Sequence, residues 1–120
     1  MNPNIPHVVY RCYDADDRLL YIGCTHDIGG RMQVHASSWN NPASAVLNMR
    51  MVRSTEVEYP DKATARAAER QAIFDEAPLL NMHHQRERVT PAARRQLMED
   101  YLEATKPPVD PFFYAAVATP

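Results

Sequence analysis

Four side chains of this sequence carry the chemical groups needed to hydrolyse a phosphodiester bond with one metal ion. Two are the phenols of Tyr10 and Tyr21, which lie in short apolar stretches, and the third is the guanidinium of Arg31. The fourth is the carboxylate of Glu69, which has alanine and isoleucine neighbours at helical spacing. A phenol can take a proton from water, a guanidinium can stabilise charge on a phosphoryl group, and a carboxylate can hold a hard divalent cation. The surrounding elements must bring these groups together.

Two strands and a turn are expected around the tyrosines. Apolar and polar residues alternate from His7 to Tyr13, and a second strand is expected from Arg18 to Gly23. The segment between them, residues 14–17, reads Asp-Ala-Asp-Asp, which is typical of a turn because aspartate hydrogen-bonds its own backbone. The sequence therefore predicts a β-hairpin.

The pairing of the hairpin decides where the phenols lie. If a four-residue loop joins the strands, Tyr10 lies directly opposite Tyr21 on the same face, with Cβ atoms about 5 Å apart. The same register places Cys24 opposite His7 rather than opposite Cys12. We therefore expect two neighbouring phenols and no disulfide bond between the cysteines.

A helix is expected after the hairpin, and it carries two further polar candidates. Thr25 or Asp27 can cap its N-terminus, and it should extend to about Ser38. Arg31 and His35 are four residues apart, so they share one face of this helix.

The second half of the chain supplies the carboxylate. A third strand is expected from Arg53 to Tyr59, and Asp61 can cap a second helix that Pro78 ends. Glu69 belongs to the inward stripe of that helix, where an unpaired carboxylate is costly, so a cation or an arginine should satisfy it. Thr90-Pro91 is typical of the start of a third helix.

These elements predict an α/β (α+β) domain with a three-stranded, mainly antiparallel sheet flanked by helices. Residues 1–86 are expected to form this domain. Residues 87–120 would be a C-terminal helical extension and an apolar tail.

The composition of the 120-residue chain bounds the function. A formal net charge of −2 and a pI near 6.2 give no global electrostatic case for binding nucleic acid, so such binding needs a local basic surface. The run from His83 to Arg95 is the most basic stretch, and it is interpreted either as a solvated linker or as a segment that binds the phosphate backbone.

The start of the chain is unlike a signal peptide, and the longest apolar run is too short to cross a membrane, so we expect a soluble cytoplasmic protein. The histidines and cysteines lack zinc-ligand spacing.

The order of these motifs resembles the GIY-YIG nuclease family. The resemblance covers residues 7 to 84, and the residues that carry it are Val8-Val9-Tyr10, Tyr21-Ile22-Gly23, Arg31, His35, Glu69 and Asn81. The succession strand, strand, helix, strand, helix is also similar to that family's core. Two positions depart from the pattern. The first motif has Val-Val in place of Gly-Ile, and His26 stands in the region after Tyr-Ile-Gly where some members carry a lysine.

The resemblance implies a metal-dependent endonuclease that hydrolyses DNA phosphodiester bonds by a single-metal mechanism. Glu69 would hold Mg²⁺ (or Mn²⁺), Arg31 would clamp the scissile phosphate, and either Tyr10 or Tyr21 would be the general base. His35 would orient a tyrosine or bind phosphate. The residues assigned to substrate binding are Gly23, His26, Asn81, Arg86 and Arg88, with Asn81 also bracing the site.

Three alternatives accompany this interpretation. The first is a catalytically inactive nucleic-acid-binding module with the same fold. The second is a protein-interaction role, in which the C-terminal helix and the Phe112-Phe113-Tyr114 tail form a homodimer or dock a partner. The third keeps the nuclease chemistry and takes RNA, which we expect less than DNA, as substrate.

Overall fold

Three strands and four helices form the part of the chain that the computed structural model describes, residues 5–37 and 41–107. In chain order they are β1 (His7–Tyr13), β2 (Leu19–Thr25), α1 (Ile28–Ser37), α2 (Pro42–Arg50), β3 (Arg53–Tyr59), α3 (Lys62–Glu76) and α4 (Pro91–Ala104). The strands form one sheet in the order β2-β1-β3, and both pairings are antiparallel. The predicted α+β fold with a three-stranded antiparallel sheet is therefore confirmed.

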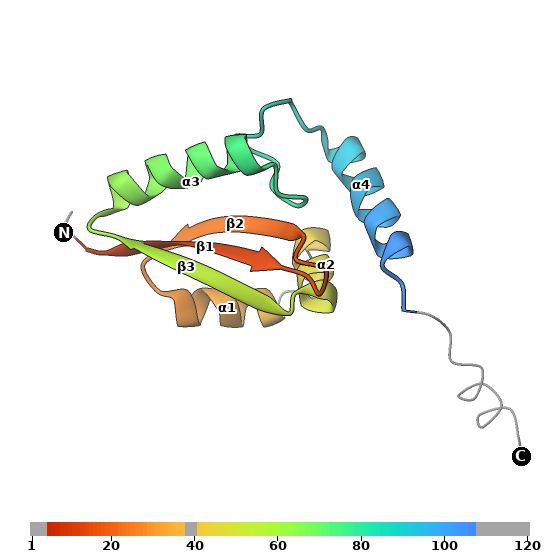
Figure 1. Ribbon diagram of the computed structural model, residues 1–120, viewed down its shortest axis with the longest axis horizontal. Helices are drawn as coiled ribbons and strands as arrows, with labels where there is room; N and C mark the ends of the chain where they lie inside the picture. The colour runs from red at the N-terminus through yellow and green to blue at the C-terminus, as the bar shows by residue number, and fades with distance from the viewer. Residues whose placement is uncertain (1–4, 38–40, 108–120) are drawn as a thin grey trace, which may run out of the picture.

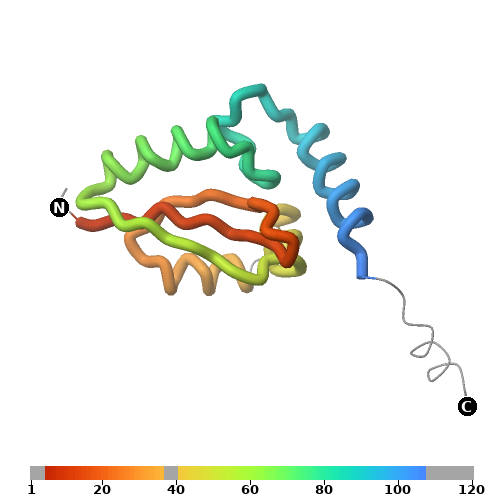
Figure 2. The backbone as a smooth tube through the Cα atoms, in the orientation of Figure 1, coloured from red at the N-terminus to blue at the C-terminus, as the bar shows by residue number. Residues whose placement is uncertain are grey.

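Helices cover both faces of the sheet (Figure 1). α3 lies along one face, α1 and α2 lie on the other, and α4 stands beyond the end that carries the β1–β2 turn. The backbone trace shows the same layers, with the segment after α3 folding back toward β2 (Figure 2). Because β2 is an edge strand, side chains from both helical layers can meet around it.

The predicted helix starts are confirmed by the side chains that cap them. Asp27 accepts a hydrogen bond from the backbone of Gly30 at the start of α1, and Asp61 accepts one from Thr64 at the start of α3. Thr90 caps α4 in the same way, directly before Pro91. These caps are local interactions, which is why the sequence predicts them well.

The predicted hairpin register is wrong by two residues. Tyr10 pairs with Gly23 rather than with Tyr21, and Tyr21 pairs with Cys12. The connection is longer than expected because Asp14 accepts hydrogen bonds from the turn backbone, and a register shift follows between Cys12 and Tyr13. A slip of two residues keeps every side chain on its face. The two phenols therefore remain neighbours, with ring centroids 6.0 Å apart.

The cysteine register is wrong for the same reason. Cys24 pairs with Val9 rather than with His7. The conclusion drawn from it is nevertheless confirmed, since Cys12 and Cys24 are both free thiols.

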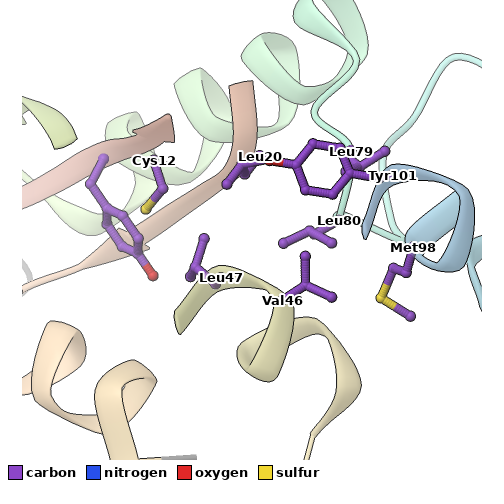
Figure 3. Close-up of a cluster of buried hydrophobic side chains, with 9 residues drawn as sticks. Cys12, Leu20, Val46, Leu47, Leu79, Leu80, Met98 and Tyr101 are labelled. Carbon is purple, nitrogen blue, oxygen red and sulfur yellow. The ribbon is translucent and has the colours of Figure 1, made fainter. Parts of the chain in front are cut away.

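α4 packs into the same core as the hairpin. Met98 and Tyr101 are buried together with Leu20 and Leu80 in one apolar cluster (Figure 3). The Tyr101 hydroxyl donates a hydrogen bond of 2.6 Å to Asp14, the carboxylate that organises the β1–β2 turn. The predicted extension after residue 86 is thus joined to the sheet through buried contacts. The Phe112-Phe113-Tyr114 tail lies outside the described residues, and its proposed role in a homodimer stays a prediction.

The segment that follows α3 pairs with the outer edge of β2. Backbone hydrogen bonds join Leu79 to Leu19 and Leu80 to Leu20. This pairing fixes the end of α3, and with it Glu69, relative to the strand that carries Tyr21.

Candidate active site

Tyr10 is the centre of a buried hydrogen-bonded chain. Arg31 Nε donates to the Tyr10 hydroxyl at 3.3 Å, and the same hydroxyl lies 3.0 Å from His35 Nε2. Arginine has only donors, so the phenol oxygen accepts from Arg31, and its O–H can donate to His35 Nε2 when that nitrogen carries no proton. This assignment requires His35 to be neutral. Burial and the charge of Arg31 both lower the pKa of His35, in agreement with it.

The position of the Tyr10 ring explains the glycine of the second motif. The ring lies against Gly23, its partner across the sheet, and a Cβ atom at Gly23 would overlap the ring carbons and the hydroxyl. Tyr10 is completely buried, and burial is the main cause that raises its pKa. The structure therefore gives Gly23 a packing role. Its assignment to substrate binding stays a prediction.

Tyr21 differs from Tyr10 in its exposure. It is only half-buried, and its ring contacts both Tyr10 and His35, the latter at 5.5 Å between centroids. Arg31 lies between the two phenols: the hydrogen bond with Tyr10 is the main cause that raises the pKa of Arg31, and Tyr21 adds to it. The half-buried phenol of Tyr21 and the guanidinium of Arg31 thus face the same space.

That space is a cleft at the edge of β2. It consists of two adjoining cavities of about 360 and 410 Å³, and both are lined by Tyr21, Arg31, Arg66 and Glu69. α1 supplies Arg31 from one face of the sheet, and α3 supplies Glu69 from the other. The phenol, the guanidinium and the carboxylate that the sequence singled out therefore line one cleft.

Glu69 is a largely buried carboxylate with incomplete charge compensation. Its side chain is 13% exposed, and its nearest ion-pair partner, Arg66, lies 3.9 Å away. Burial raises the pKa of Glu69, while the charges of Arg66, His84, Arg70 and Arg31 oppose that rise. A carboxylate in this position gains from a bound cation.

The donor set around Glu69 suits one class of metal ion. No group of three or more His, Cys, Asp or Glu side chains within residues 5–37 and 41–107 could enclose a metal. A site with one carboxylate fits a hard cation such as Mg²⁺, which keeps several waters and also binds substrate phosphates. It does not fit a zinc site built from four protein ligands.

Asn81 braces the site through the backbone of β2. Its side-chain oxygen accepts a hydrogen bond from the Ile22 N–H at 3.0 Å, and its side-chain nitrogen donates to the Ile22 carbonyl at 2.9 Å. Both polar ends of the buried amide are thus satisfied by the residue that follows Tyr21. The predicted bracing geometry is present, while direct substrate contact by Asn81 stays a prediction.

The other three candidates for substrate binding lie at different distances from the cleft. His26 lines the cavity of about 410 Å³ and packs against His7, with ring centroids 5.5 Å apart. Arg86 lies over the ring of Phe74, and Arg88 lines a separate cavity beside the start of α4. The structure groups His26 with the catalytic candidates and does not group the two arginines with them.

Several basic residues complete the lining of the cleft. Lys62 and Arg66 were missed by the sequence reasoning, although their spacing of four, and of three from Arg66 to Glu69, places all three on one face of α3. The further basic or imidazole side chains of the lining are His7, His83, His84 and Arg94. Within the described residues, Glu69 is the sole carboxylate of the lining. The cleft is therefore a local basic surface on an acidic protein.

The structure is a small α+β domain in which a phenol, a guanidinium and a carboxylate line one cleft. The sequence model of the GIY-YIG catalytic domain matches residues 6–81, and the chain belongs to this family. No curated protein and no solved structure gives a significant match. No helix within the described residues is long and apolar enough to cross a membrane.

Proposed function

We propose that this protein is a metal-dependent endonuclease that hydrolyses DNA phosphodiester bonds. Membership of the GIY-YIG family, which is a family of nucleases, supports this proposal. The observation that carries the proposal is the convergence of Tyr21, Arg31 and Glu69 on one cleft. The other charged side chains of its lining are basic, as far as residues 5–37 and 41–107 are concerned. Such a cleft attracts a polyanion although the whole chain is acidic.

Arg31 is proposed to hold the scissile phosphate. Its Nε donates to Tyr10 and the guanidinium also interacts with Tyr21, so its fork is fixed in direction beside both phenols, where its planar donors suit phosphate oxygens. A fixed positive charge stabilises the charge that develops on the phosphoryl oxygens. Glu69 would hold Mg²⁺ or Mn²⁺, which supplies a Lewis acid for the same phosphate and for the leaving oxygen.

Tyr21 is proposed as the general base, and Tyr10 as the residue that positions it. Tyr10 borders the cavity of about 410 Å³ but is fully buried, and its hydroxyl already has Arg31 and His35 as hydrogen-bond partners. Tyr21 is half-buried and lines both cavities of the cleft, where an attacking water can reach its hydroxyl. Arg31 beside it compensates the negative charge that develops on the phenol during proton transfer.

Plasmid cleavage tests this proposal. Purified protein is incubated with supercoiled plasmid in Mg²⁺ or Mn²⁺, with EDTA as the control, and nicked and linear products are separated. We expect products only with the metal, and a loss of at least about a hundredfold in rate for Glu69→Gln, because the amide cannot hold the cation with the same charge. Cleavage by Glu69→Gln at the wild-type rate would refute the metal assignment.

A non-catalytic binding module is the second candidate, because the basic lining alone suffices to bind nucleic acid. A panel of duplex DNA, single-stranded DNA and RNA, each tested for binding in EDTA and for cleavage in Mg²⁺, separates the two. Binding without cleavage of any substrate would establish the module. Faster cleavage of RNA than of DNA would keep the nuclease chemistry and correct the substrate.

A further inference from the structure

The N-terminal half of α3 contributes positive charges to the cleft in addition to the proposed reacting groups. Lys62, Arg66 and Glu69 lie on one face of α3 and all line the cavity of about 410 Å³. Arg66 also lines the cavity of about 360 Å³, whereas Lys62 lines only the cavity of about 410 Å³. Lys62 is exposed, and the side chain of Arg66 is 52% exposed, so both cations can meet a ligand without unfolding.

Two imidazoles stand at the same end of the cleft. His7 comes from the start of β1 and His26 from the turn after β2, and their rings are packed together beside Lys62 in the cavity lining. His7 Nδ1 donates to the Ile5 carbonyl at 2.9 Å, which leaves Nε2 for other partners. Asp61 is the acidic side chain near His7, and it is engaged in capping α3. The end of the cleft thus presents cations and nitrogen ligands from three elements.

The Lys62 end of the cleft is too far from the reacting groups to contact the same phosphate. Lys62 precedes Glu69 by seven residues, which is two helical turns and about 10 Å along the axis of α3. A phosphate held between Arg31 and an ion on Glu69 is therefore not the phosphate that Lys62 meets. A nucleic-acid strand carries further phosphates on both sides of the one that is cut.

We propose that Lys62, with Arg66 and His26, forms a second phosphate-binding subsite that holds the nucleic-acid backbone beside the scissile phosphate. The proposal rests on the proposed function in that the ligand is a nucleic-acid strand. It adds the direction of that strand, which runs along α3 from the Lys62 end of the cleft to the His83, His84 and Arg94 end.

The lysines of the chain provide a matched pair of variants. Lys62→Ala removes one positive charge from the subsite, and Lys106→Ala removes one from the exposed segment after α4, where no cleft residue lies. Binding of a short fluorescein-labelled DNA duplex is measured by anisotropy in EDTA over a series of salt concentrations. EDTA prevents cleavage, so the measurement does not depend on catalysis.

For Lys62→Ala, we expect the slope of log affinity against log salt to fall in magnitude by about 0.9, the value for one phosphate contact on duplex DNA. At about 0.1 M salt this corresponds to roughly eightfold weaker binding. Lys106→Ala should keep the wild-type slope, and Lys62→Arg should restore it. In cleavage assays, Lys62→Ala should raise KM by a larger factor than it lowers kcat.

Three other results would contradict the proposed phosphate-binding subsite. Equal slopes for Lys62→Ala and Lys106→Ala would show that Lys62 meets no phosphate, even if the wild-type protein cleaves DNA. A loss of kcat with unchanged binding would place Lys62 at the reacting phosphate instead. Inorganic phosphate that competes with the duplex equally well for wild-type protein and Lys62→Ala would likewise exclude it. Failure of the proposed function would give a different result: the wild-type protein would not cleave DNA, while Lys62→Ala would still reduce the salt dependence of DNA binding as expected.

Discussion

Exchanging each tyrosine of the cleft for phenylalanine separates a residue that takes a proton from a residue that positions its neighbours. Both variants keep the ring and remove one hydroxyl. In Tyr10→Phe the lost hydroxyl leaves His35 Nε2 and Arg31 Nε without their shared partner. Because this position is fully buried, we expect an unfolding free energy lower by about 1–3 kcal/mol. In Tyr21→Phe the hydroxyl comes from a half-buried residue, and we expect a smaller loss of stability.

The expected effects on catalysis have the opposite order. General-base catalysis contributes typically about 10²–10⁴-fold, so Tyr21→Phe should lower kcat by a factor in that range. Tyr10→Phe removes none of the proposed reacting groups but loosens the position of Arg31, and we expect a loss of about tenfold. The assay is single-turnover cleavage of a labelled duplex at saturating enzyme, with thermal unfolding of the same preparations.

The assignment of Tyr21 as the general base is refuted if the two variants exchange their effects on cleavage. If Tyr21→Phe cleaves at nearly the wild-type rate while Tyr10→Phe loses activity by a hundredfold and remains as stable as the wild-type protein, then Tyr10 is the base. The closed hydrogen-bonded chain would then have to open during the reaction.

Three further perturbations test the positioning of the site. Gly23→Ala places a Cβ atom in overlap with the hydroxyl end of the Tyr10 ring, so it should displace that phenol and lower the unfolding free energy by about 1–3 kcal/mol. Urea unfolding and cleavage kinetics measure the two effects. Folding lowers the pKa of His35, so its neutral form stabilises the native state above the unfolded-state pKa of about 6.5, and this stability is lost as the pH falls through the folded value. Urea unfolding of wild-type protein and His35→Gln from neutral to mildly acidic pH should show a steeper fall for the wild type. Tyr101→Phe leaves one oxygen of Asp14 without its 2.6 Å donor and should lower the unfolding free energy by about 1–3 kcal/mol, and an unchanged melting temperature would contradict that role.

Features with local causes could be predicted from the sequence. Asp61 and Thr90-Pro91 mark helix starts because a cap needs only the residues beside it. The common face of Tyr10 and Tyr21 follows from the period of two along a strand, which survives a slip of two residues.

Features that depend on how elements sit against one another could not be predicted. The hairpin register depends on the hydrogen bonds that Asp14 makes to its turn and on the shift beside Tyr13. Lys62 and Arg66 show their helical spacing in the sequence, yet nothing local says that this face of α3 overhangs the edge of β2. The hydroxyl of Tyr10 differs from that of Tyr21 in its burial and in its hydrogen bonds to Arg31 and His35, and both differences depend on how α1 packs against the sheet.

The position of the cleft follows from the way the segment after α3 leaves β2. Leu80 still pairs with β2 through its backbone, but at Ile22 the partner is the side-chain amide of Asn81, which satisfies both the N–H and the carbonyl. Because a side chain takes over the pairing there, the main chain after Asn81 can turn away toward α4. The remaining edge of β2, with Cys24 and Thr25, then lines a cavity instead of a paired strand. Tyr21 precedes Ile22, so the same amide that ends the pairing lies beside the cavities that Tyr21 lines, which is where the proposed general base needs its space.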